Sequence, residues 1–565
     1  MKIFVFLSTI CFLQFIKSAI KKFQFQPNSN DSYVKASVYL DNQTGKYRFS
    51  ENYDENAVAY GMFTKKLETD GWDYLSISSN IEPRYNATTK AFAMGFLEGI
   101  LTRDSIFSHY INMKHNSMFS SNNQMPEFMK KFFQNHHNYI IQMYNSFPSD
   151  IYWANAYTIF MQLKGMVDGY NSVQEKDKQI DIIDFHIIAS TPELDDIMNS
   201  DIHHRKNISA MTLNEILNYI DSRSHCSVLF KLSPDFSELY LGHNTWTSFN
   251  SMNRIFKEYR FKAGIENSFT MAFSSYPGAL NSIDDFYVTD NDLLVTETTN
   301  EVFDESLFDK ISPNSLLTWE RAMIANRLAT DAKSWTEIFA RYNSGTYNNQ
   351  FMIVDLKLVD LENKAIKDNA FWIIEQIPGY TEAADMTQIL RYGYWPSYNS
   401  AYFKTIRELS KYQEQILKFP ELRDHIDYST CARANIFRRD NPLVTDLDQM
   451  MKLLRYNNYK NDVLSKNNPT LAISERKDLN ENSPDCIGGI DTKIVKLSDL
   501  KNSKQKKIYI VSGPTSDNLP VFQFSKANCD VKYLKLGLPD KYEFDWIEYT
   551  TNLFDIEETK IEADY

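Results

Sequence analysis

Apolar residues in the first half of the chain recur at three- and four-residue spacing, which is the pattern of amphipathic helices. The spacing predicts helices over 91–113, 127–144 and 151–166. A polar stretch follows at 191–207 and indicates an exposed connector. We therefore predict that residues 19–225 form a mostly helical N-terminal segment.

Beyond residue 226 the pattern changes to short apolar runs separated by turn residues, which is typical of strands. Two helical segments, 315–329 and 334–343, interrupt them. Strands joined by short turns favour antiparallel sheets, and helices must then cover the outer faces. The predicted fold class is α+β, with two antiparallel sheets between helices in a four-layer αββα sandwich. The predicted strands are 226–232, 238–246, 267–278, 284–290, 293–299, 350–358 and 370–379.

The N-terminus has the features of a signal peptide. Lys2 precedes a short apolar run, residues 3–16, and the small residues Ser18 and Ala19 follow it. The run is short for a membrane anchor, which is the alternative, and no later run is long enough to cross a bilayer. We predict a signal peptide at 1–18 and a secreted or lysosomal protein. Four glycosylation sequons agree with this route: Asn30, Asn42, Asn86 and Asn207.

Composition excludes several classes of function. The chain has 565 residues, of which 43% are hydrophobic, and a formal charge of −13. An acidic chain without a basic block is a poor candidate for nucleic-acid binding. It also lacks the polybasic patch that holds proteins on anionic membranes. No repeat or Pro/Gly linker divides the chain.

Five cysteines are present, and Cys11 leaves with the signal peptide. Cys486 and Cys529 are the nearest neighbours in the C-terminal region, so we predict that they pair in a disulfide. This leaves Cys226 and Cys431 as thiols. A leftover thiol in an exported protein is either a buried core cysteine or a functional group.

Cys226 heads one strand of a predicted hairpin whose turn is residues 233–238. Counting back from the turn places the stretch 242–245, with His243 and Asn244, beside Cys226. A cut between His225 and Cys226 gives Cys226 an α-amino group of pKa about 7.7–8. That amine can serve as general base toward its own thiol. The alternative is an ordinary buried cysteine at the start of a core strand.

Several multi-residue motifs run in order through the chain after residue 225. On these motifs the chain resembles the phospholipase B-like family, also called lamina-ancestor proteins. Residues 431–432 are one departure, because some relatives carry other residues there. The motifs are HCS (225–227), GHNTW (242–246), FSSYPG (273–278), TETT (296–299), RYNSGTYNNQFMIVD (341–355), YWPSYN (394–399) and ARANIFRRD (432–440).

The resemblance implies an N-terminal-nucleophile hydrolase with the αββα fold. It implies a precursor that is cut before Cys226, with the N-terminal chain, 19–225, and the catalytic chain, 226–565, remaining associated as one integrated domain. Cys226 corresponds to the family's nucleophile. The pocket residues of the family correspond to His243, Trp246, Thr299, Asn399 and Arg433, and we add the neighbouring Asn244.

Each of these residues has a chemical role that fits and a structural alternative. Asn399 is suited to donate its amide N–H to an oxyanion, or it is a turn asparagine. Arg433 holds Asn399 or an anionic group, or it is a surface charge. His243 orients the amine or accepts a hydrogen bond from Thr299, or it is a satisfied strand histidine. Trp246 lines a pocket or the core.

Other chemistries lack support in the sequence. We find neither a G-x-S-x-G elbow nor an H-E-x-x-H motif. The pairs 136–137 and 203–204 are histidines without ligand partners at useful spacing. We therefore expect no metal and no organic cofactor.

The function we predict is a hydrolase that cleaves itself before Cys226 and deacylates phospholipids through a thioester. Two alternatives remain open. In the first alternative, the protein is an amidase that acts on N-acyl lipids or small amides, because a fold does not determine the substrate. Otherwise it is a non-catalytic lipid-binding protein that retains the fold.

Overall fold

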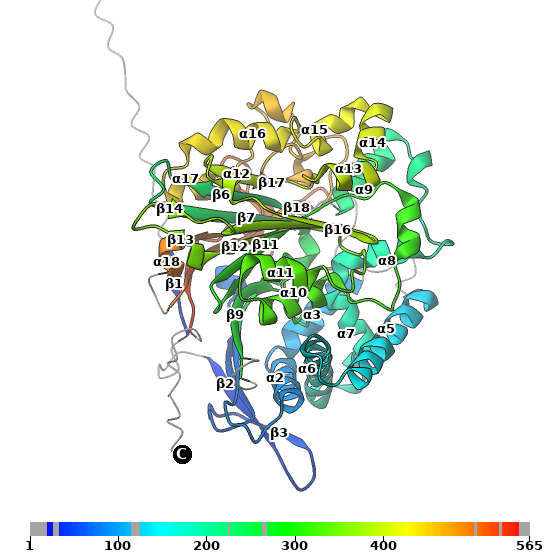
Figure 1. The fold of residues 1–565 in the computed structure, drawn as a ribbon, viewed down its shortest axis with the longest axis vertical. Coiled ribbons are helices and arrows are strands. Elements are labelled where there is room, and N and C mark those ends of the chain that lie inside the picture. The colour runs from blue at the N-terminus through cyan, green and yellow to red at the C-terminus, as the bar shows by residue number, and fades with distance from the viewer. Residues whose placement is uncertain are drawn as a thin grey trace, which may run out of the picture.

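The computed structural model describes residues 20–25, 33–114, 125–223, 226–262, 268–501, 505–529 and 534–552. The predicted signal peptide, Asn30 and His225 lie outside these ranges. Two large sheets lie face to face in the middle of the molecule, with helices on both outer sides (Figure 1). The predicted α+β class is therefore confirmed.

The first sheet has seven strands. In spatial order they are β1 (Lys21–Phe23), β22 (Ile547–Thr550), β19 (Lys507–Ser512), β18 (Ile487–Lys496), β7 (Leu239–Ser248), β6 (Ser227–Leu232) and β17 (Tyr394–Ser397). The strand that begins directly after Cys226 therefore lies near one edge, between β7 and β17.

The second sheet has eleven strands. In spatial order they are β16 (Tyr380–Asp385), β15 (Phe371–Ile377), β12 (Asn349–Asp355), β11 (Leu293–Thr299), β10 (Tyr287–Thr289), β9 (Phe269–Ser275), β8 (Ile255–Phe261), β5 (Asp73–Ser79), β4 (Ala59–Thr64), β2 (Val34–Leu40) and β3 (Tyr47–Ser50). It faces the first sheet through contacts such as the Phe230 and Phe371 rings, whose centroids are 4.9 Å apart. Two small sheets complete the strands: β13 (Val359–Asp360) with β14 (Ala365–Ile366), and β20 (Phe522–Gln523) with β21 (Lys541–Tyr542).

Helices cover both sheets on their outer faces (Figure 1). On the side of the eleven-stranded sheet lie α2 (Ala87–Leu101), α3 (Arg103–Met113), α5 (Glu127–Ser146), α6 (Ile151–Val173), α7 (Ile182–Ala189), α10 (Thr318–Leu328) and α11 (Ala332–Phe339). Over the seven-stranded sheet lie α12 (Thr387–Leu390), α13 (Lys404–Leu409), α14 (Tyr412–Lys418), α15 (Arg423–Ile426), α16 (Ala432–Asp440) and α17 (Leu447–Leu454). The others are α1 (Leu67–Asp70), α8 (Leu194–Ser200), α9 (Leu213–Arg223) and α18 (Leu497–Lys501).

The sheets are not purely antiparallel, so that part of the prediction is wrong. Strands β5 and β8 pair in parallel, and so do β1 and β22. Parallel neighbours need a long crossover connection. The helical segment between β5 and β8 supplies one, and almost the whole chain separates β1 from β22.

The N-terminal part of the chain also differs from the prediction in two places. It carries five strands, β1 to β5, before its first long helix. The stretch 191–207 is not simply an exposed connector, because α8 lies within it and Glu193 and Asp196 are buried. Glu193 accepts hydrogen bonds from the backbone N–H groups of Thr318 and Trp319, at the start of α10. A distant segment thus satisfies polar groups that a sequence pattern assigns to solvent.

Helices α2 and α6 pack with their backbones in contact. A Cβ atom added at Gly95 would lie 1.9 Å from the carbonyl oxygen of Gln162, and one at Gly165 would lie 2.0 Å from that of Phe92. Gly99 and Gly169 have equally close neighbours on the opposite helix. Only glycine permits this approach, so these four positions set the distance between the two helices.

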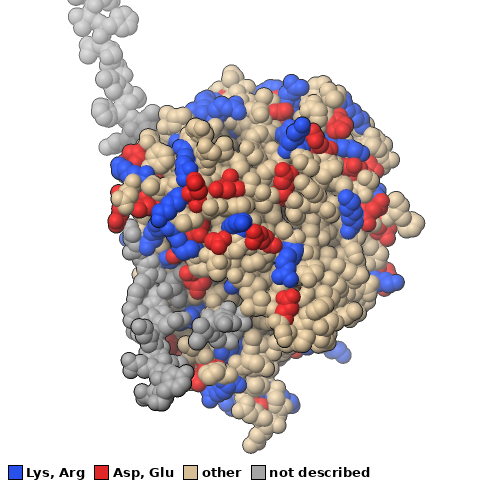
Figure 2. Space-filling model, viewed as in Figure 1, with Lys and Arg blue, Asp and Glu red and all other residues tan. Residues whose placement is uncertain are grey.

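Two properties of the surface and the helices bear on partners. Among the described residues, no helix combines the length and the apolar character that a bilayer crossing requires. On the face drawn in Figure 2, positive and negative side chains are interspersed and no large patch of one sign stands out. This face therefore offers no basic groove of the kind that tracks a nucleic-acid backbone.

Candidate active site

The hairpin of β6 and β7 has the predicted register. Ser227 pairs with Asn244 and Val228 pairs with His243. The stretch 242–245 therefore lies beside the start of β6, as the turn position indicated. On the other side of β6, Ser397 of β17 pairs with Val228. This pairing brings the loop after β17, which holds Asn399, to the same end of the sheet.

Cys226 directly precedes β6 and is fully buried. Its φ angle is 95°, a region that side-chain-bearing residues rarely adopt. The Sγ atom lies 3.9 Å from Oε1 of Glu297, within reach of a hydrogen bond from sulfur. Burial and the neighbouring Glu297 raise the pKa of the Cys226 thiol well above its ordinary value, and Lys493 offsets this only in part. In the uncut chain the thiol is therefore protonated and neutral.

Arg433, at the start of α16, connects Cys226 with Asn399. Its Nη1 donates to the carbonyl oxygen of Cys226 at 2.9 Å and to Oδ1 of Asn399 at 2.8 Å. The guanidinium lies over the ring of Trp246, 4.3 Å from the centroid. Arg433 is buried, so the alternative of a surface charge is wrong.

Asn399 and Thr299 are joined through the backbone. The Asn399 amide Nδ2 donates to the carbonyl oxygen of Thr299 at 2.9 Å. Asn399 also adopts a positive φ of 61°, a conformation that asparagine tolerates better than most residues. Thr299 Oγ1 has no hydrogen-bond partner among the described residues, so the expected bond between Thr299 and His243 does not form.

The residues of β7 form a buried polar network behind the thiol. Trp246 Nε1 donates to Oδ1 of Asn244 at 2.7 Å, and Asn244 Nδ2 donates to Thr492 Oγ1 at 2.8 Å. His243 Nδ1 lies 3.3 Å from Thr245 Oγ1. Burial and the charge of Lys493 lower the pKa of His243 well below its ordinary value, so the imidazole is neutral.

A cluster of buried charges lies next to this network. The ammonium of Lys493 lies 2.6 Å from Asp284 and 2.8 Å from Asp491. The Arg254 guanidinium is 2.8 Å from the same two carboxylates. Burial opposes ionisation of Asp284, but Arg254 and Lys493 outweigh it and hold the pKa of that carboxyl well below its usual range. The cluster is therefore two cations paired with two anions.

Glu297 differs from this cluster because none of the described cations forms an ion pair with it. Burial raises the pKa of Glu297 well above its ordinary value, although the Tyr347 hydroxyl donates to Oε1 at 2.9 Å and partly offsets the effect. A carboxyl with a raised pKa is a stronger base once it is ionised, and its Oε1 lies 3.9 Å from the sulfur of Cys226. Glu297 is therefore a candidate acceptor for the thiol proton.

Sequence reasoning missed Glu297, Asp284 and Lys493. Glu297 lies within the quoted TETT motif, but a motif names no role for each member. Asp284 lies six positions after the FSSYPG motif, and Lys493 lies in β18, two positions after Asp491. A charged residue in the middle of a buried strand is a signal for a site, because an unpaired charge there is costly.

A cavity of about 420 Å³ opens beside the thiol. Cys226, Trp246 and Thr299 line it together with Tyr276 and Tyr347. Asp221 and Arg223 of α9, the helix that leads to the predicted cut, form part of its wall. Its volume lies in the range of small-molecule sites, and its lining mixes apolar and polar groups.

Among the residues that the structure describes, two groups of side chains have the composition of metal ligands. In one, the ligand atoms of Cys226, His243 and Glu297 lie within 4.8 Å of one another. The other contains His136, His186 and Glu320. The sequence argument considered only partners at nearby positions, whereas Glu320 lies 2.9 Å from His136 across 184 positions of the sequence.

Comparison with known proteins places the chain in a family. The model of the phospholipase B family matches residues 59–549. This chain belongs to the phospholipase B family. Phospholipase B-like protein C of Dictyostelium discoideum is 38% identical, over 90% of this chain and 90% of its own length. Phospholipase B-like 1 of Bos taurus is 35% identical, over 87% of this chain and 88% of its own. Phospholipase B of Crotalus adamanteus is 34% identical, over 91% and 92%.

The remaining sites named from the sequence of this family member are three sequon asparagines and three cysteines. The Asn42, Asn86 and Asn207 side chains are exposed, and Asn86 and Asn207 also cap helices. Cys486 and Cys529 form a disulfide in the structure. Cys431 is a buried free thiol at the start of α16.

Proposed function

We propose that this member of the phospholipase B family is an N-terminal-nucleophile hydrolase that removes acyl chains from phospholipids. The observation that carries the proposal is the position of Cys226. It stands directly before β6, in a strained conformation, at a cavity that Trp246 and Thr299 also line. Two sheets packed between helical layers support the same fold type. The names of the relatives, as phospholipases B, support the substrate class.

The first reaction we propose is cleavage before Cys226. Glu297 accepts the thiol proton, and Sγ attacks the carbonyl carbon of His225. The C–N bond breaks, the nitrogen of Cys226 takes a proton, and a thioester joins His225 to Sγ. Water then attacks the thioester, which leaves a carboxylate on His225 and a free thiol and amine on Cys226. A backbone held at positive φ stores about 1–3 kcal/mol, which favours breaking this bond.

The second reaction is turnover of a lipid ester. The new α-amine of Cys226 accepts the thiol proton, and Sγ attacks the ester carbonyl. Asn399, oriented by Arg433, donates a hydrogen bond to the oxyanion. The alcohol leaves with the proton from the ammonium, and water releases the fatty acid from the thioester. Neutral His243 and Trp246 fill the wall behind the sulfur.

The expected place of action follows from the N-terminal sequence. We propose that residues 1–18 direct the chain into the secretory pathway, where Asn30, Asn42, Asn86 and Asn207 are glycosylated. The mature protein is then secreted or lysosomal. The chains 19–225 and 226–565 stay associated, because strands from both contribute to both sheets.

The test is mass spectrometry of the N-termini of protein purified from its own secretory pathway. We expect the wild type and Cys431→Ala to yield a fragment beginning at Cys226, while Cys226→Ala stays intact. Cys431→Ala is the matched control because it also removes a buried free thiol. A wild-type chain that stays intact after incubation at acidic pH contradicts the cleavage mechanism.

A substrate comparison then tests the ester chemistry. Vesicles of a diacyl phospholipid and of its amide analogue are incubated with the cleaved protein, and released fatty acid is measured. We expect release from the ester only, and none with Cys226→Ala. Faster release from the amide would replace the phospholipase with an amidase. Lipid binding without release by the cleaved wild type would replace it with a lipid-binding protein.

A further inference from the structure

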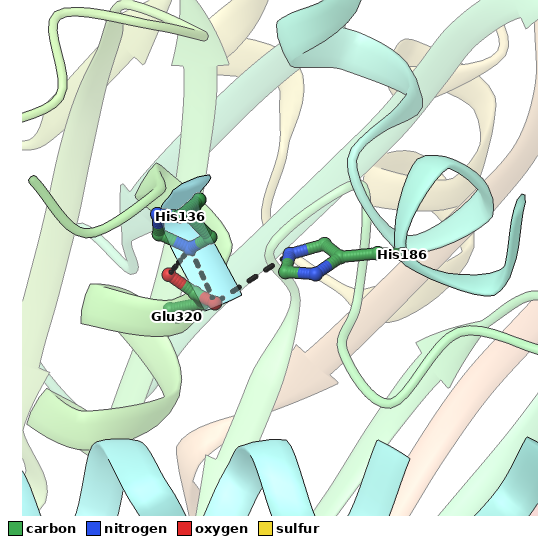
Figure 3. A group of neighbouring side chains, drawn as sticks. All are labelled: His136, His186 and Glu320. Atoms are coloured by element: carbon green, nitrogen blue, oxygen red, sulfur yellow. Dashed lines mark hydrogen bonds and ion pairs between the residues drawn. The ribbon is translucent and has the colours of Figure 1, made fainter. Parts of the chain in front are cut away.

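Three buried side chains that take no part in the Cys226 site face one another between helices. His136 lies on α5, His186 on α7 and Glu320 on α10. In Figure 3 the Glu320 carboxylate points between the two imidazole rings. Nε2 of His136 is 2.9 Å from Oε2 of Glu320, and Nε2 of His186 is 3.5 Å from Oε1. All three side chains are almost completely shielded from solvent.

The Nδ1 atom of each imidazole, which faces away from Glu320, has a partner, and this partner determines whether the Nε2 atom facing Glu320 carries a hydrogen. Nδ1 of His136 lies 3.2 Å from the carbonyl oxygen of Pro313, which can only accept, so Nδ1 carries the hydrogen. Nδ1 of His186 lies 2.7 Å from Nε2 of His137. Nε2 of His186 makes no hydrogen bond within the described part of the chain. When Nδ1 of His186 donates to His137, two lone pairs and a carboxylate converge on one point.

We propose that His136, His186 and Glu320 bind one Zn²⁺ ion. Two imidazole nitrogens and one carboxylate are a ligand set that zinc uses in proteins. Ligands about 2.0–2.1 Å from a tetrahedral ion lie about 3.3 Å apart. One oxygen of Glu320, Oε1, lies 3.0 Å from Nε2 of His136 and 3.5 Å from Nε2 of His186, and these two distances bracket that value. All three ligand atoms lie within 4.8 Å of one another, so a small closure completes the site.

The surroundings supply the supporting hydrogen bonds and the charge that such a site needs. Metal-bound histidines donate their second N–H to a protein acceptor, as the Pro313 and His137 contacts provide. The backbone N–H of Leu317 donates to Oε2 of Glu320 at 3.0 Å and orients the carboxylate. Glu193 lies close enough to act electrostatically on His136, so two carboxylates balance the two positive charges of the ion.

The site joins parts of the chain that lie far apart in the sequence. His136 and His186 precede residue 226, and Glu320 follows it. The metal site itself does not depend on cleavage, but a further role does rest on the proposed function. If the chain is cut before Cys226, the ion holds the two fragments together through ligands from each.

The experiment measures metal content by mass spectrometry in full-length protein dialysed against metal-free buffer. We expect one zinc per chain in the wild type and a loss of about tenfold or more in Glu320→Gln and His186→Gln. Glu375→Gln is the matched control, because Glu375 is also buried but hydrogen-bonds to Gln350 and to the backbone of Tyr402 and Phe403, and it should keep its zinc. Cys226→Ala, which the proposed mechanism leaves uncut, should also keep its zinc, so this inference and the cleavage can fail separately.

A second measurement covers the case in which a ligand variant does not fold. Wild-type protein stripped with a chelator is titrated with Zn²⁺ alone, and its Tm is recorded. We expect Tm to rise with zinc, and Co²⁺ to give the visible absorption of a tetrahedral site. A wild-type chain that carries no zinc and whose Tm does not respond to added Zn²⁺ overturns the proposal. So does a Glu320→Gln chain that retains wild-type zinc content.

Discussion

Nη1 of Arg433 lies 2.9 Å from the carbonyl oxygen of Cys226, a contact between residues 207 positions apart in the sequence. The same nitrogen donates to Asn399, so one guanidinium contacts both the backbone of the proposed nucleophile and the proposed oxyanion donor. Arg433 does not need to touch the substrate for this role. It is a positioning residue, and its loss should displace two groups at once.

We expect Arg433→Lys to lower kcat for the ester roughly 10²-fold with little change in KM, because small displacements of reacting groups cost about that much. Lysine keeps the charge but loses the planar group that stacks on Trp246. Arg438→Lys, at an exposed position of the same helix, is the control and should behave as wild type. Equal kcat values in the two variants would contradict the positioning role.

Glu297→Gln should slow cleavage before Cys226 about 10²–10⁴-fold, the usual contribution of a general base. Turnover by any cleaved Glu297→Gln protein should fall much less, because the α-amine has then become the base. The measurement is the rate at which the C-terminal fragment appears after synthesis. If Glu297→Gln is cleaved at the wild-type rate, a group other than Glu297 accepts the proton of the Cys226 thiol. Glu375→Gln controls for loss of a buried carboxyl.

Gly165→Ala should destabilise the fold by about 2 kcal/mol or more. Alanine gains about 1 kcal/mol of helix propensity over glycine. The added Cβ would lie 2.0 Å from the carbonyl oxygen of Phe92, however, and overpacking of this kind costs about 3 kcal/mol. The control is Lys164→Ala, on the exposed face beside it. Urea unfolding measures both, and a stabilised Gly165→Ala protein would show that α2 and α6 separate easily.

The protein should be more stable in mild acid than at neutral pH, in part because of Glu375. Burial raises the pKa of Glu375 to about 7, although the N–H groups of Tyr402 and Phe403 partly offset this. The folded state therefore binds a proton that the unfolded state has released, and stability falls as pH rises from about 4.5 through about 7. The full contribution is roughly 3 kcal/mol, from about 1.4 kcal/mol per pKa unit.

Urea unfolding at about pH 5 and about pH 8 measures this effect. The wild type should lose stability between the two values, and Glu375→Gln should lose less, because the amide does not titrate. Equal losses in the two proteins would mean that Glu375 is not protonated in the folded state at mildly acidic pH.

Local patterns predicted the parts of the fold that local forces determine. Helices α5 and α6 and the β6–β7 hairpin follow from apolar spacing and turn residues, and the hairpin register placed His243 and Asn244 beside Cys226. The helix predicted over 91–113 is instead two helices, α2 and α3, which meet at Thr102. The parallel pairing of β5 with β8 was missed because the sequence near either strand does not indicate which strand it pairs with. Long crossovers join strands that share no turn.

The site likewise contains residues that local motifs identified and residues that they did not. Motifs identified Arg433 and Asn399, but the hydrogen bond between them is a tertiary contact that sequence spacing does not predict. Glu297 and Lys493 were missed because most of their partners come from distant parts of the chain, so the sequence around each gives it no role. The histidine argument covered nearby positions only, and Glu320 reaches His136 from a helix that follows Cys226. Ligand spacing in the sequence detects sites within one segment only.

The strands of the N-terminal segment affect how a protein cut before Cys226 would refold. β1 completes the edge of the seven-stranded sheet against β22, and β2 to β5 complete the other sheet through β8 (Figure 1). A precursor folds as one chain, in which all these strands are covalently connected. After a cut at residue 226 the same sheets must be rebuilt by two separate molecules, so refolding becomes concentration-dependent. Maturation would then be a one-way step, after which denaturation destroys an arrangement that the fragments reassemble only by meeting again.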